Sequence, residues 1–69
     1  MDEEQQQERA DLISRVFALI TGKLEDAATL AVECQGRRRK EELRNDAMKL
    51  QDLCTEAKTI TEAVTALLE

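Results

Sequence analysis

Gln35-Gly36-Arg37-Arg38-Arg39-Lys40 is the stretch that decides the fold of this 69-residue chain. It holds one of the two glycines and four of the ten basic residues, and the apolar periodicity changes phase across it. A single helix through this stretch would carry a split apolar seam. Two helices joined by a turn at Gly36 remove the mismatch. We therefore predict a hairpin, with Gly36 in the left-handed conformation that ends many helices.

The composition predicts an all-α fold, an antiparallel, coiled-coil-like pair of helices. The chain has no proline and one aromatic residue, Phe17, and its apolar residues are mainly Ala, Leu, Ile and Val. Its length allows one domain, near the lower limit for a self-supporting core. The predicted organisation is a flexible, acidic, Gln-rich segment 1–7 and one hairpin domain 8–69, with helix 8–34, turn 35–37 and helix 38–68.

Apolar residues recur at steps of three and four in both halves, which is the heptad pattern. The phase is the same on both sides of Gly22, so the first helix should continue through it. We place Phe17 and Leu24 on the seam towards the other helix, and folding at Gly36 sets Ile13 opposite Ile60. The predicted interaction face consists of Ile13, Val16, Phe17, Ile20, Leu24, Ala27, Ala31, Leu43, Ala47, Leu50, Leu53, Ala57, Ile60, Val64 and Leu67.

This apolar surface covers close to half of the first helix, more than a two-stranded seam needs. A lone hairpin would leave a long apolar face exposed. A second copy would cover it by forming a four-helix bundle around a two-fold axis. The alternative is a partner protein whose helix lies in the groove. We expect the homodimer first.

The basic run Arg37, Arg38, Arg39 and Lys40 is the sharpest local feature, and three interpretations stay open. It is a turn whose arginines are solvated or bind the carbonyls that end the first helix, a contact for an acidic or phosphate-bearing partner, or an element that orients a dimer. Residues 2–11 carry five acids and one base, opposite in sign to the turn. In a head-to-tail dimer the two would meet at both ends, and we prefer this third interpretation.

Several functional classes lack the residues they need. The chain has no histidine, and Cys34 and Cys54 lie too far apart along a hairpin to form a disulfide. We expect both cysteines to be small buried apolar residues. We predict no catalytic residue, no cofactor, no metal site and no membrane segment, hence not an enzyme. The cysteine usage and the acidic N-terminus favour a cytoplasmic protein.

A net charge of −5 is unfavourable for general nucleic-acid binding. In length, hairpin and heptads the chain resembles two groups, in architecture only. The Rop-type RNA-binding hairpins of plasmid copy control imply a nucleic-acid regulator that uses the basic turn. The small hairpin co-chaperones of type III secretion needle subunits imply a subunit that holds a partner helix in its groove. The basic residues outside the turn are scattered among acids: Arg9, Arg15, Lys23, Arg44, Lys49 and Lys58. We therefore expect a non-catalytic adaptor or regulatory protein that acts through helix–helix contacts and self-association.

Overall fold

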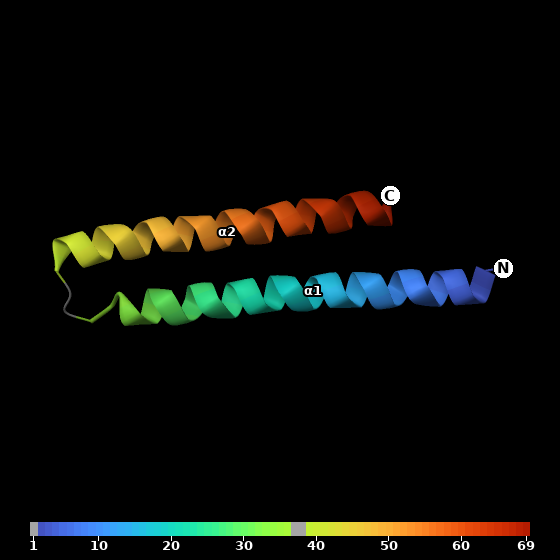
Figure 1. Cartoon of the computed structure of the whole chain (residues 1–69), viewed down its shortest axis with the longest axis horizontal. Coiled ribbons are helices and arrows are strands. Elements are labelled where there is room, and N and C mark those ends of the chain that lie inside the picture. The colour runs from blue at the N-terminus through green and yellow to red at the C-terminus, as the bar shows by residue number, and fades with distance from the viewer. Residues whose placement is uncertain (1, 37–38) are drawn as a thin grey trace.

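The computed structural model describes residues 2–36 and 39–69. Helix α1 spans Asp2–Glu33 and helix α2 spans Lys40–Leu68, and the two run antiparallel side by side (Figure 1). The described residues form no strand, so the prediction of an all-α two-helix hairpin is confirmed. The Cα trace measures 58 × 16 × 11 Å, which makes the hairpin a long slab one helix thick.

Helix α1 begins at Asp2, so residues 2–7, predicted as a flexible segment, are helical in the structure. These residues include no helix breaker, and their carboxylates suit the positive end of a helix dipole. The helix continues through Gly22 as predicted. Beside it the Thr21 hydroxyl donates to the Phe17 carbonyl at 3.0 Å.

The connection starts as a turn, although its glycine differs from the prediction. The amide of Gln35 donates to the Val32 carbonyl at 3.0 Å, and that of Gly36 donates to the Glu33 carbonyl at 3.2 Å. Gly36 has no positive φ, so the predicted left-handed conformation is wrong. These short hydrogen bonds already engage carbonyls at the end of α1 without a left-handed residue.

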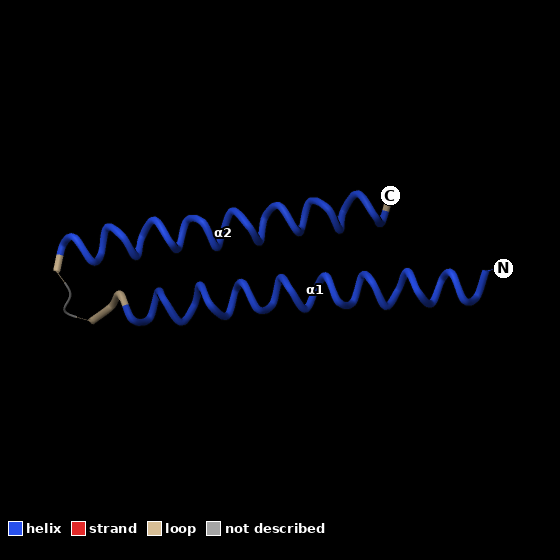
Figure 2. The backbone as a smooth tube through the Cα atoms, viewed as in Figure 1, coloured by secondary structure: helices blue, strands red, loops and turns tan. Residues whose placement is uncertain are grey.

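Helix α2 begins at Lys40, after an extended Arg39 with φ −67° and ψ 149°. No side chain caps this end, and the stretch 35–40 contains no Ser, Thr, Asp or Asn that could do so. Glu41 and Glu42 lie in the first turn, where acids favour the helix dipole. Arg37 and Arg38, and with them the predicted first residue of this helix, lie outside the described residues. Figure 2 shows the two helices and the loop between them.

The two helices meet along a seam of buried or half-buried residues, spaced alternately by three and four positions. We call these the seam residues. They are Ile13, Val16, Ile20, Lys23, Ala27, Leu30 and Cys34 in α1, and Leu43, Asp46, Leu50, Leu53, Ala57, Ile60 and Val64 in α2.

Polar contacts across the seam fix the register. Lys23 Nζ lies 2.6 Å from Glu56 Oε2, and the Cys34 thiol donates to Asp46 Oδ2 at 3.8 Å. At the open end Arg9 donates to the carbonyl of Leu67. The predicted register, with Ile13 opposite Ile60, is therefore displaced, and Ile13 shares a surface depression with Leu67. The cause is the connection, which is longer than the predicted turn 35–37 and shifts α2 by more than one helical turn.

Candidate interaction surface

The structure divides the predicted interaction face between the seam and the solvent. Its members on the seam are Ile13, Val16, Ile20, Ala27, Leu43, Leu50, Leu53, Ala57, Ile60 and Val64. Ala31 is half-buried beside the seam, whereas Phe17, Leu24, Ala47 and Leu67 are exposed. Phe17 is 48% exposed and Leu24 is 53% exposed, although both were predicted to face the other helix.

Three of the exposed large apolar residues, Phe17, Leu24 and Leu68, belong to two regular rows. Each row lies one position after alternate seam residues and continues at the same spacing past one end of the seam. We call these the outer rows. The outer row of α1 is Ala10, Phe17, Leu24 and Ala31, and the outer row of α2 is Ala47, Cys54, Thr61 and Leu68. Each row repeats every seven residues, and all its members except Ala31 are exposed. Neither row contains a charged residue.

Both outer rows lie on the same broad side of the slab. Each step of one residue turns the side-chain direction by ~100° about the helix axis, in the same sense as the chain advances. Because α1 and α2 run in opposite directions, that rotation turns both rows to one side. We call this side the uncharged face. It combines Phe17 and Leu24 of one helix with Cys54 and Leu68 of the other.

The opposite side carries the residues one position before alternate seam residues, and most of them are charged. They are Leu12, Leu19, Asp26 and Glu33 in α1, and Glu42, Lys49, Glu56 and Ala63 in α2. We call this side the charged face. The Lys23–Glu56 ion pair lies along it, above a shallow depression that Thr55 and Thr59 also line. The hydrogen bond that the Lys23 ammonium donates to Glu56, together with the negative charge of Glu56, raises the pKa of Lys23.

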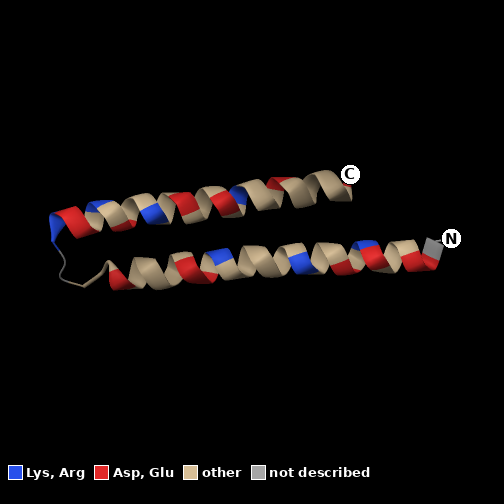
Figure 3. Ribbon diagram, viewed as in Figure 1, with Lys and Arg blue, Asp and Glu red and all other residues tan. Residues whose placement is uncertain are grey.

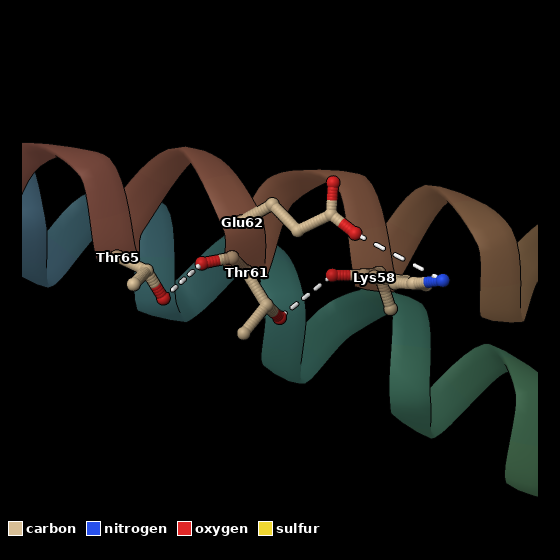
Figure 4. Close-up of polar contacts among 5 residues, drawn as sticks. Lys58, Thr61, Glu62 and Thr65 are labelled. Carbon is tan, nitrogen blue, oxygen red and sulfur yellow. Dashed lines mark hydrogen bonds and ion pairs between the residues drawn. The ribbon is translucent and has the colours of Figure 1, made fainter.

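The hydroxyls of α2 near the uncharged face are bonded to their own helix. The Thr61 hydroxyl donates to the Ala57 carbonyl at 2.7 Å, and the Thr65 hydroxyl donates to the Thr61 carbonyl at 3.0 Å (Figure 4). Lys58 Nζ lies 3.9 Å from Glu62 Oε1 one turn along. Since the hydroxyls are satisfied within α2, these threonines need no hydrogen bond from a partner.

The basic run is only partly described. Arg39 and Lys40 are exposed, and Arg37 and Arg38 lie outside the described residues. Elsewhere the basic residues are interspersed among more numerous acidic ones along both helices, without a basic stripe on either (Figure 3). The structure therefore offers no continuous cationic track within the described residues.

The two cysteines have different surroundings. Cys34 is half-buried on the seam against Asp46, whereas Cys54 is exposed, so the prediction that Cys54 is buried is wrong. Cys54 stands one position after the seam residue Leu53, which turns it to the uncharged face. Neither cysteine forms a disulfide within the described residues. Within the described residues no three His, Cys, Asp or Glu side chains gather in a way that could hold a metal ion. Neither described helix is long and apolar enough to cross a membrane.

Sequence reasoning missed two polar seam residues, Lys23 and Asp46. Each has an apolar neighbour one position on, Leu24 and Ala47, and hydrophobicity alone favoured the neighbours. The missing signal was spacing, because Lys23 and Asp46 continue the alternation of three and four that the other seam residues follow. No family model, no curated protein and no solved structure matches this chain.

Proposed function

We propose that this protein is a non-catalytic adaptor or regulator that acts through helix–helix association, and that its first partner is a second copy of itself. The product would be a four-helix bundle. One observation carries this proposal: the uncharged face displays Phe17 and Leu24, each about half exposed, within rows that contain no charge. Helices that face a bundle core carry such a third apolar position beside the two of a simple coiled-coil seam.

The surface area supports the same proposal. A compact monomer of 7.8 kDa exposes about 4,400 Å², whereas this hairpin exposes 5828 Å². Only Ala27, Ala57 and Val64 are buried apolar residues, so the described hairpin has a small core of its own. A partner that covers the uncharged face would enlarge this core at little cost, because almost no charge is desolvated.

Two cysteines outside any disulfide in the described residues agree with a reducing compartment, and we assign the protein to the cytoplasm. A second copy explains the uncharged face better than a nucleic acid does. Phosphate backbones reward clustered Lys and Arg, and the apolar rows supply none. A foreign helix is the remaining rival for the same face.

Sedimentation equilibrium and light scattering over a range of protein concentrations test the proposal directly. We expect a species of twice the 7.8 kDa chain mass, helical by circular dichroism. A chain that stays monomeric at high micromolar concentration would contradict self-association. If such a monomer gained helix only with a host-cell protein, the partner-helix alternative would replace it. Gel shifts at low and physiological salt test nucleic acid separately, and we expect none at physiological salt.

A further inference from the structure

We propose that the second copy docks head-to-tail on the uncharged face, with α1 lying antiparallel against α1 of the partner and Phe17 packing on the partner's Leu24. This inference rests on the proposed self-association and specifies its surface and orientation. It follows from three features: a second seam on α1, the register that sets which residues of α1 and α2 lie level with each other, and the charges at the two ends of the hairpin.

Helix α1 carries a complete second heptad seam beside the first. It consists of Ala10, Ser14, Phe17, Thr21, Leu24, Ala28 and Ala31, spaced alternately by four and three. All are uncharged, and all but the half-buried Ala31 are exposed. A single helix needs one seam to pair within its hairpin, so a second seam indicates a second helical neighbour.

The second seam is self-complementary when two copies of α1 run antiparallel about Thr21. Phe17 then lies level with the partner's Leu24, which places the two large side chains together near the two-fold axis. Towards the ends, Ala10 lies level with the partner's Ala31. Small residues at the ends let the helices approach closely, and the large central pair fills the space between them.

The register of the hairpin lets α2 pack against α2 of the partner around the same two-fold axis. The Lys23–Glu56 contact sets these two residues level across the hairpin, so Thr21 is level with Lys58. An axis beside Thr21 therefore passes close to Lys58 and brings Cys54 to within about one position of the level of the partner's Thr61. Lys58 is the one charged residue of α2 near this contact. Its ammonium pairs with Glu62, and its aliphatic stem can cover apolar surface.

The charges at the two ends of the hairpin favour a head-to-tail dimer over a dimer in which both turns lie side by side at the same end. Helix α1 projects beyond the end of α2 at the open end of the hairpin (Figure 1). The exposed acids Glu3 and Glu4 lie on this projection, and the exposed Arg39 and Lys40 lie at the other end. Head-to-tail docking brings these opposite charges to the same end of the bundle, twice. Side-by-side turns would bring like charges together instead.

The size of the face also fits a stable dimer. Its outline is 58 by 16 Å. That is roughly 900 Å², close to the ~800 Å² that each partner contributes to a standard interface. The charged face has the same outline. A second copy that docked there would have to desolvate Asp26, Glu33 and Glu42 and the same three residues of the partner.

The first experiment compares Leu24→Glu with Leu19→Glu. The two leucines lie on the same helix and are 53% and 59% exposed, but Leu24 is on the uncharged face and Leu19 is on the charged face. We expect Leu24→Glu to weaken the dimer by about 100-fold or more, because two carboxylates enter the interface. Leu19→Glu should change the dissociation constant by only about threefold, as a solvent-exposed substitution. Equal effects, or a larger effect from Leu19→Glu, would overturn the choice of face.

The second experiment tests orientation by disulfide formation in a Cys34→Ser, Cys54→Ser background. Thr21→Cys should give a covalent dimer on mild oxidation, because the introduced thiols meet at the two-fold axis. Thr29→Cys is the matched control, since Thr29 points away from the second seam, and it should remain monomeric on a denaturing gel. No cross-link from Thr21→Cys in a chain that sediments as a dimer would overturn the head-to-tail arrangement. A wild-type monomer would instead overturn the proposed function itself.

Discussion

The ammonium of Lys23 lies 2.6 Å from the carboxylate of Glu56 and joins the middle of α1 to α2. Lys23 occupies a seam position, yet its charge reaches the edge of the charged face rather than the core. Both side chains keep access to water, at 36% and 50% exposure, so salt and solvent screen the pair. Its main structural effect is therefore to fix the register of the two helices.

The pH dependence of stability should reveal this pair. Because the pKa of Lys23 is raised above 10.5 in the folded hairpin, the contact stabilises fully below pH 10.5 and is lost as the pH rises through the folded pKa. We expect wild type to exceed Lys23→Met in stability by a constant amount from pH 7 to about 10, and the difference to shrink above that. Urea unfolding followed by circular dichroism measures it. Glu56→Gln should behave like Lys23→Met, and a difference that grew with alkaline pH would contradict the assignment.

Gly22 should be replaceable with a gain in stability. It lies inside α1, and a Cβ built there meets nothing within 4 Å. Gly22→Ala should therefore raise the free energy of unfolding by about 1 kcal/mol, through helix propensity and a less flexible unfolded chain. Unfolding in urea at one fixed protein concentration measures the change. A loss of stability would mean that the glycine is required for close approach of another helix.

The same substitution at Gly36 provides a comparison with Gly22→Ala for the effect on stability. It has no positive φ, and an added Cβ would meet the Glu33 carbonyl oxygen at 3.5 Å, an ordinary contact. Gly36→Ala should therefore change stability by less than about 0.5 kcal/mol. A loss well above 1 kcal/mol would show that the turn needs glycine after all.

The two-helix fold was predictable because its signals agree. The absence of breakers, the heptads and the phase change at Gly36 all indicate a hairpin. The seam was not predictable to the residue, because Leu24 and Ala47 compete with Lys23 and Asp46 at neighbouring positions. On each helix the outer row lies one position from the seam, and only the packing decides which of the two faces the other helix.

The register and the turn escaped prediction for a related reason. A glycine in sequence favours a left-handed helix end, but the turn after Glu33 closes through ordinary backbone hydrogen bonds instead. The connection that follows is longer than a minimal turn, and heptads tolerate displacement by whole repeats. Contacts such as Cys34–Asp46 pair a thiol with a carboxylate, so a search for apolar residues alone does not find them although both positions follow the seam spacing.

The apolar core near the open end depends on Val64, which is only 2% exposed. Val64→Ala should lower the free energy of unfolding by about 1–2 kcal/mol, since it removes two buried methyl groups. Val32→Ala is the matched control, because Val32 is the same residue type and is largely exposed on α1. Its effect should be near zero or slightly stabilising. Equal losses from both variants would show that Val32 is covered in the assembly.

The native thiols report on the uncharged face without any substitution. In dilute solution Cys54, which is exposed, should react with a thiol reagent faster than Cys34, which is half-buried on the seam. As protein concentration rises, the second copy covers Cys54 and its labelling should slow, whereas the rate at Cys34 stays constant. In Leu24→Glu the labelling of Cys54 should stay fast at every concentration. Mass spectrometry of the labelled peptides separates the two sites. If Cys54 reacted at one rate across the range in which sedimentation shows dimer formation, the second copy would have to dock on a face that leaves Cys54 open.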